Sequence, residues 1–209
     1  MRENDKWSIL VDKTKKLQYV LDLSWNIYFE RLISRKISIN LESSMQLHYA
    51  AIINSIGEQL IVKPNEYFKI ELEHFSNDTN KYIDIECSYN DIKAAIELKC
   101  FRKNSNRAMD IDMYDCLKDI ERLESYSNHK IKKFICLTDN AAYLDGKHSG
   151  HAGIVSIKDG RKIFKNTEIH PTWKGKWKSP LRDTSILINS EIEFNWIRDE
   201  SWYYLIINL

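Results

Sequence analysis

Apolar and polar residues alternate along two consecutive stretches near the middle of the chain. In residues 81–89, every second position is apolar: Ile83, Ile85 and Cys87. Residues 92–101 alternate in the same way, and Asn90 with Asp91 between the two stretches favours a tight turn. Because alternation with a period of two is typical of a half-buried strand, the pattern predicts a β-hairpin.

The sequence on either side of this hairpin extends the order of elements. Residue spacing predicts four further elements: a helix at 38–60, a strand at 67–73, a helix at 109–126 and a strand at 133–138. Ser38 or Asn40 is the expected cap of the first helix. The predicted order is α-β-β-β-α-β, which indicates an α/β (α+β) fold with a mixed central sheet flanked by helices.

The two ends of the chain are expected to complete this core. A helical pattern within residues 4–36 is expected to pack on the core or on a second copy of the chain, as in a homodimer. Residues 144–182 hold five of the six glycines, which favours loops or a small β-extension. The tail, residues 186–209, predicts a strand or hairpin that completes the sheet. We expect one domain across all 209 residues, with a core at about 38–140 and an extension at about 141–209.

Composition narrows the class of protein. An apolar content of 43% is enough for a core, and no run of eighteen apolar residues predicts a membrane span. The four cysteines have no C-x-x-C spacing and are expected to be reduced core thiols. Because the chain begins with no signal-peptide pattern, we expect a cytoplasmic protein. The net charge of +1 excludes a uniformly basic nucleic-acid coat, so contacts to DNA would have to be local.

Charged residues cluster on the polar face of the predicted hairpin. Glu97 and Lys99 lie two residues apart and therefore share a face, which Asp84 on the paired strand is expected to join. Two carboxylates and a backbone carbonyl, here that of Leu98, suit Mg²⁺, which lowers the pKa of a bound water. A neighbouring lysine can orient or deprotonate that water. The alternative is that these charges are only the solvated face of an amphipathic hairpin.

The pattern of Asp84, twelve intervening residues and then Glu97-Leu98-Lys99 resembles the PD-(D/E)xK nuclease superfamily, which includes many type II restriction endonucleases. The resemblance covers the expected core, whose order of elements is that of the family. Ile83 stands where the family motif has proline. The resemblance implies that Asp84, Glu97 and the Leu98 carbonyl bind Mg²⁺, or Mn²⁺ in its place. It also implies that Lys99 positions or activates the attacking water.

Members of this family often supply a further acidic ligand from the helix before the sheet, and Glu42 matches that position. The alternative is a structural role, since the helix dipole favours an acidic residue in the first turn. Two basic groups are candidates for contacts to DNA phosphates. They are Arg102, Lys103 and Arg107 beside the hairpin, and Lys174, Lys176 and Lys178 in a tryptophan-containing loop. A solvated basic loop is the alternative explanation of the second group.

These observations lead to two functional hypotheses. The first is a Mg²⁺-dependent endonuclease that hydrolyses DNA phosphodiester bonds, as a type II restriction-like enzyme or another prokaryotic defence or repair nuclease. The second is a non-catalytic nucleic-acid-binding or protein-interaction module on the same fold. Divalent metal separates them, because only a real site should bind Mg²⁺ or Mn²⁺ and raise the melting temperature.

Overall fold

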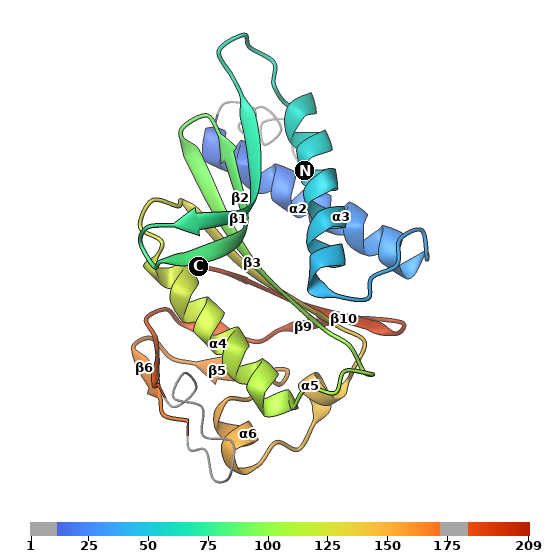
Figure 1. The fold of residues 1–209 in the computed structure, drawn as a ribbon, viewed down its shortest axis with the longest axis vertical. Helices are drawn as coiled ribbons and strands as arrows, with labels where there is room; N and C mark the ends of the chain where they lie inside the picture. Colours follow the sequence, from blue (N-terminus) through green and yellow to red (C-terminus); the bar gives the residue numbers. More distant parts are fainter. Residues whose placement is uncertain (1–11, 172–183) are drawn as a thin grey trace. The chain divides into compact units, whose positions relative to one another are not determined.

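The chain forms both helices and strands in a computed structural model that describes residues 12–171 and 184–209 (Figure 1). The helices of this part are α2 (Lys13–Ile33), α3 (Glu42–Gln59), α4 (Met109–Ser125), α5 (Ala142–Asp145) and α6 (Gly150–Ile154). Its strands are β1 (Phe68–Ser76), β2 (Lys81–Tyr89), β3 (Ile92–Phe101), β4 (Ile131–Thr138), β5 (Lys162–Ile163), β6 (Thr167–Ile169), β7 (Ile186–Ile188), β8 (Ile192–Glu193), β9 (Trp196–Asp199) and β10 (Trp202–Asn208). Six strands form one sheet in the order β1-β2-β3-β4-β10-β9.

The chain divides into two units. The first comprises the described residues up to Leu98 together with Tyr126–Lys133, and the second comprises Lys99–Ser125 and the described residues from Phe134 onward. The mixed α and β class is confirmed, and the order α3-β1-β2-β3-α4-β4 agrees with the predicted α-β-β-β-α-β. The expectation of one domain over the whole chain stays a prediction.

Helices α2 and α3 pack against each other in the first unit (Figure 1). Helix α2 begins after Asp12, whose side chain accepts hydrogen bonds from two amides of the first turn. The Trp25 ring stacks on Tyr28 with 5.1 Å between centroids and meets Tyr49 of α3 edge-on at 5.4 Å. All three rings are buried, so they form part of the apolar contact between the helices. The predicted N-terminal helix is therefore confirmed where the structure describes it.

The start of α3 differs from the expectation. The helix begins at Glu42 with Leu41 as its cap residue, so the predicted cap at Ser38 or Asn40 is wrong. The amide of Leu41 donates instead to Ser44 Oγ at 3.3 Å, a side chain that reaches back from inside the helix. This contact is one of the two hydrogen bonds of a capping box, and it is present although the cap residue, Leu41, has no polar side chain.

The predicted hairpin is confirmed. β2 and β3 pair antiparallel from Tyr89↔Ile92 to Ile85↔Ile96, and Asn90 in the turn has φ of 52°. Asparagine tolerates this left-handed conformation better than most residues, which explains its place there. β1 pairs antiparallel with the other edge of β2.

The second unit contains the other predicted elements. Helical spacing in α4 relates six apolar residues, of which five are buried and the first, Met109, is half-buried. The five are Met113, Cys116, Leu117, Ile120 and Leu123. β10 pairs antiparallel with β9 and joins the six-stranded sheet, which confirms the prediction for the tail. Two small sheets, β5-β8 and β6-β7, form the expected β-extension. All four cysteines are free thiols, and three of them are buried.

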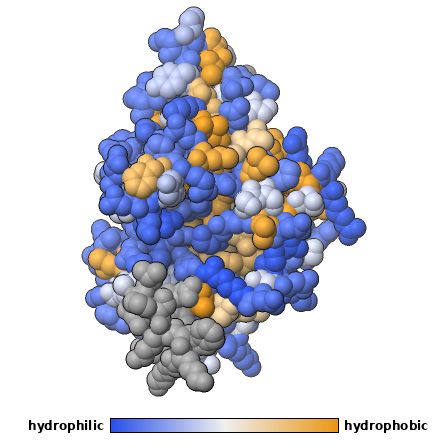
Figure 2. Space-filling model, in the orientation of Figure 1, coloured by the Kyte–Doolittle hydropathy of each residue, from blue (hydrophilic) through white to orange (hydrophobic). Residues whose placement is uncertain are grey.

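The surface seen in Figure 2 is mostly hydrophilic, with apolar residues scattered across it. Scattered apolar residues are normal on a folded protein and identify no binding face by themselves. Within residues 12–171 and 184–209, no helix has both the length and the apolar character needed to cross a membrane.

Candidate active site

The pairing of β2 with β3 brings the two predicted acidic ligands to one face of the sheet. Glu86 pairs with Ala95, so these residues share a face. Asp84 lies two residues before Glu86 and Glu97 two residues after Ala95, so both lie on this same face. In addition, Asp84 Oδ2 accepts a hydrogen bond from the Leu98 amide at 2.6 Å. Asp84 is thus held against the part of β3 that contains Glu97.

Glu97 is a buried carboxylate. Its exposed fraction is 0%, and its Oε1 accepts a hydrogen bond from Tyr126 Oη at 3.0 Å. Glu86 on the same face is also buried, with 6% exposure. The interpretation of this face as a solvated surface is therefore wrong for both glutamates. Burying a carboxylate costs free energy unless its oxygens are paired, so the donors around each glutamate are needed to stabilise it.

Lys99 follows Glu97 by two residues on β3, and its ammonium forms an ion pair with Asp119 of α4 at 2.6 Å. Both side chains are nearly buried, with 14% and 8% exposure. Sequence reasoning missed Asp119. The available signal was its position three and seven residues after Cys116 and Asp112, on the buried stripe of α4.

Glu42 is the first residue of α3 and is half-buried. One turn later, Gln46 Nε2 donates to the Asp84 carbonyl oxygen at 2.7 Å and to Glu73 Oε1 at 2.8 Å. Glu73 lies between two residues of β1 that pair with Ile83 and Ile85, and therefore opposite Asp84. α3 thus contacts the backbone of the motif through Gln46, and Glu73 is a further acidic residue that the sequence did not single out.

The backbone of Glu73 is strained. Its φ is 49°, which a glutamate rarely adopts. Strained residues of this kind persist only where surrounding contacts stabilise them, and they cluster at functional sites. Here the hydrogen bond from Gln46 supplies one such contact.

The basic residues beside the hairpin have protein partners. Arg102 pairs with Asp139 at 2.9 Å and lies 4.9 Å from the centre of the Trp202 ring. Arg107 forms an ion pair with Asp112 at 2.9 Å. These contacts neutralise part of the positive charge of Arg102 and Arg107, two of the residues predicted to contact DNA phosphates. Lys103 is exposed, whereas Lys174, Lys176 and Lys178 lie outside the described residues.

Glu86 remains ionised although it is buried. Burial raises the pKa of its carboxyl, but hydrogen bonds from His129 and Lys93 outweigh this effect and lower the pKa to about 2. The distances are 2.7 Å to His129 Nε2 and 2.9 Å to Lys93 Nζ. The face of the sheet that contains Asp84 and Glu97 therefore contains a third carboxylate whose partners keep it charged.

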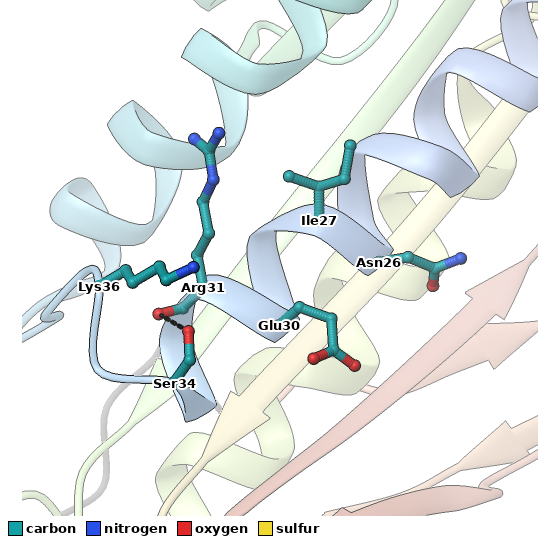
Figure 3. Close-up of a pocket in the computed structure, with 6 residues that line it drawn as sticks. All are labelled: Asn26, Ile27, Glu30, Arg31, Ser34 and Lys36. Carbon is teal, nitrogen blue, oxygen red and sulfur yellow. Dashed lines mark hydrogen bonds between the residues drawn. The ribbon is translucent and has the colours of Figure 1, made fainter.

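A shallow pocket of about 330 Å³ lies at the end of α2 and in the following turn (Figure 3). Its lining is Asn26, Ile27, Glu30, Arg31, Ser34 and Lys36. None of the predicted site residues lines it. The candidate site is therefore the group of carboxylates on the hairpin and not this pocket.

Comparisons with protein-family models, with curated proteins and with solved structures find no match to this chain.

Proposed function

We propose that the chain is a Mg²⁺-dependent endonuclease that hydrolyses DNA phosphodiester bonds, with a core of the restriction-endonuclease type. The observation on which this depends is the shared face of Asp84 and Glu97, with Lys99 two residues further along β3. The order α3-β1-β2-β3-α4-β4 supports the proposal, because it is the order of elements that the resemblance to PD-(D/E)xK nucleases implies.

The donor set suits Mg²⁺. Carboxylate oxygens of Asp84 and Glu97 and the backbone carbonyl of Leu98 are all hard oxygen ligands, which Mg²⁺ prefers over nitrogen or sulfur. Glu42 would add a further oxygen ligand of the same kind. Mn²⁺ accepts the same oxygen ligands and could replace Mg²⁺. When bound, such a metal lowers the pKa of a coordinated water and neutralises charge on the phosphate.

Lys99 would then orient the attacking water. An ammonium paired with Asp119 is a hydrogen-bond donor and a fixed positive charge, so it aligns water and stabilises charge that develops on the phosphate oxygens. Its partner restricts the long side chain, which limits the conformational entropy lost on reaching the reactive geometry. Tyr126 restricts Glu97 in the same sense through its hydrogen bond.

The test is cleavage of mixed plasmid and phage DNA by the purified protein with Mg²⁺ or Mn²⁺, beside Lys99→Ala. The matched control is Lys162→Ala, which removes a lysine that is also ion-paired, with Glu193 at 3.5 Å. We expect the wild type and the control to cut, and Lys99→Ala to lose at least about 100-fold in rate, the scale of a catalytic proton-transfer or electrostatic contribution.

The pattern of products distinguishes the kinds of enzyme. Discrete fragments indicate a sequence-specific nuclease, and a smear or nicking indicates a non-specific or structure-directed one. Equal cleavage by Lys99→Ala contradicts the role of Lys99. No cleavage of DNA, RNA or branched DNA with either metal contradicts the enzyme and supports the binding module.

A further inference from the structure

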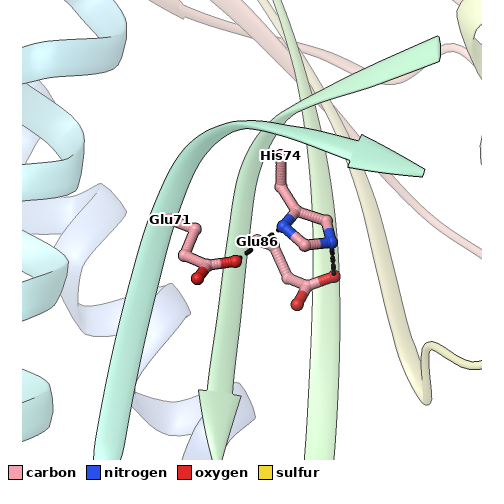
Figure 4. A group of neighbouring side chains, drawn as sticks. All are labelled: Glu71, His74 and Glu86. Carbon is pink, nitrogen blue, oxygen red and sulfur yellow. Dashed lines mark ion pairs between the residues drawn. The ribbon is translucent and has the colours of Figure 1, made fainter.

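A second group of charged side chains lies between β1 and β2, beside the Asp84 position. It consists of Glu71, His74 and Glu86, and we call it the β1–β2 cluster (Figure 4). One potential ligand atom of each residue lies within 4.8 Å of those of the other two. Figure 4 shows the three side chains directed toward one another.

The strand register and one irregular residue bring the cluster together. Glu71 pairs directly with Glu86, so these two share a face. His74 is three residues after Glu71 and would point to the opposite face of a regular strand. The left-handed φ of 49° at Glu73 interrupts the alternation, and His74 Nδ1 lies 2.6 Å from Glu71 Oε2. The strained residue is therefore what allows the histidine to join the carboxylates.

The imidazole of His74 faces a carboxylate with each of its nitrogens. Nδ1 meets Glu71, and Nε2 lies 3.6 Å from Glu86 Oε2. A protonated imidazole donates to both carboxylates, whereas a neutral one has a single N–H and presents a lone pair to one negative oxygen. A cation between Nε2 and Oε2 converts that repulsion into two attractive contacts.

The spacing suits a metal–ligand pair. Two ligands bound to Zn²⁺ at about 2.0–2.1 Å in tetrahedral geometry are about 3.3–3.4 Å apart. The Nε2 to Oε2 distance of 3.6 Å is close to that value. Glu71 is the third residue of the cluster, with one ligand atom within 4.8 Å of those of the other two, while its Oε1 contacts Lys69.

His129 is a second and independent feature that points into the cluster. Its exposed fraction is 8%, its Nε2 lies 2.7 Å from Glu86 Oε2, and its Nδ1 is buried without a hydrogen-bond partner among the described residues. With Nδ1 lacking an acceptor, the proton is best placed on Nε2, where it donates to Glu86. Such outer hydrogen bonds orient ligating carboxylates in metal sites.

We propose that the β1–β2 cluster binds one divalent transition metal of the Zn²⁺ class, with His74, Glu86 and Glu71 as ligands and His129 as the residue that orients Glu86. A nitrogen ligand distinguishes this site from the oxygen-only set at Asp84 and Glu97, since imidazole favours Zn²⁺ over Mg²⁺. The metal would join β1 to β2 and so stabilise the strand pair that contains Asp84. This inference does not depend on nuclease activity.

The competing explanation is an ion-pair network. Lys93 already pairs with Glu86 Oε1 and Lys69 with Glu71, so the carboxylates have positive partners without a metal. Both lysine side chains are well exposed, at 43% and 61%, and can turn toward solvent at small cost. The two explanations differ in what Zn²⁺ does.

The experiment is calorimetric titration of the full chain with Zn²⁺ in the presence of millimolar Mg²⁺, which competes at the oxygen-only site. We expect one equivalent of Zn²⁺ to bind, and the melting temperature to rise by about 5–10 °C at a Zn²⁺ concentration of about 100 Kd. His74→Ala should weaken binding by at least about 10-fold, the scale of losing a group around a metal. The His74 side chain is 33% exposed, so this variant should fold.

The matched control is His170→Ala. His170 is also beside a glutamate, with Nε2 3.6 Å from Glu168 Oε2, but no second carboxylate of the described residues faces it. It should bind Zn²⁺ as the wild type does. No binding at 100 µM Zn²⁺, binding unchanged by His74→Ala, or equal loss in both variants would overturn the proposal. Because cleavage is not measured, failure here is distinct from failure of the nuclease proposal.

Discussion

Glu97 and Glu86 are buried carboxylates on neighbouring strands of one sheet face, yet their surroundings differ. Both carboxylates receive a hydrogen bond from the segment that follows α4. Tyr126 donates to Glu97 and His129 to Glu86, and the centroids of the Tyr126 and His129 rings are 5.6 Å apart. Glu97 lies on the face with Asp84 and Lys99, so its neighbourhood offers oxygen ligands. Glu86 meets two imidazoles and an ammonium. If both proposals hold, one face of the sheet presents two sites that select different metals.

The residue opposite each glutamate explains part of this difference. Glu86 pairs with Ala95, which has no polar side-chain atom, and its hydrogen bond comes from His129. Glu97 instead lies beside Asp84, which is fixed by the Leu98 amide. The comparison can be tested by changing one group at a time.

The largest expected effect is that of Glu97→Gln. The amide is similar in size, so the variant should fold, but a neutral oxygen binds Mg²⁺ poorly. We expect cleavage to fall by at least about 100-fold, or about 2.7 kcal/mol of transition-state stabilisation, and the rise in melting temperature with Mg²⁺ to disappear. Glu193→Gln, at an exposed glutamate paired with Lys162, is the control. Full activity in Glu97→Gln would mean that Glu97 is not a ligand of the catalytic metal, and it would contradict the proposed oxygen-only site.

Tyr126→Phe should show how far Glu97 depends on its phenol. Removing the hydroxyl leaves a fully buried carboxylate with one hydrogen bond fewer, which should lower the free energy of unfolding by about 1–3 kcal/mol. Urea unfolding measures this change. Tyr82→Phe, at a tyrosine with 56% exposure, should stay within about 0.5 kcal/mol of the wild type. Equal effects would mean that the hydroxyl of Tyr126 does not stabilise Glu97.

Asp119→Asn should have a smaller effect on catalysis than loss of Lys99 itself. Without its ion-pair partner, Lys99 keeps its charge but loses its fixed position, so kcat should fall by about 10-fold while KM changes little. Asp119→Glu should restore part of the rate. The control is Asp110→Asn in the first turn of the same helix. A fall in folding stability without a change in kcat would assign Asp119 a purely structural role.

The sequence predicted those features that depend on local pattern. Period-two alternation and Asn90 at the turn identified the hairpin, and helical spacing identified α4 from Met109 to within one residue of its end. These elements were predictable because their side chains repeat with the geometry of the backbone. The cap of α3 was not, because Ser44 acts from inside the helix rather than before it.

The partners of the site residues were not predictable from the sequence. His129 and Glu86 are 43 positions apart, and Tyr126 and Glu97 are 29 apart, so only the folded chain brings them together. His74 was hidden for a second reason. Strand periodicity assigns it to the wrong face, and the left-handed Glu73 that reverses this has no sequence signal such as glycine.

Glu66 belongs to neither proposed metal site, and its variant should give the smallest effect. Hydrogen bonds from the amide of Val62, the Tyr89 hydroxyl and the amide of Lys63 lower its pKa to about 2, with a further contribution from the charge of Lys16. Because the folded-state pKa lies below the ordinary value of 4.5, its stabilising contribution is present above pH 4.5 and is lost as the pH falls toward 2.

In Glu66→Gln, the free energy of unfolding should therefore depend less on pH between about 4.5 and 2 than it does in the wild type. Urea unfolding at a series of pH values measures this slope, and Glu58→Gln, at an exposed glutamate of α3, should leave it unchanged. Neither Mg²⁺ nor Zn²⁺ should alter the effect, because Glu66 belongs to neither site. If added metal changed the slope difference at Glu66, the separation of structural from metal-binding carboxylates would fail, since a group with no ligand role should not respond to the ion.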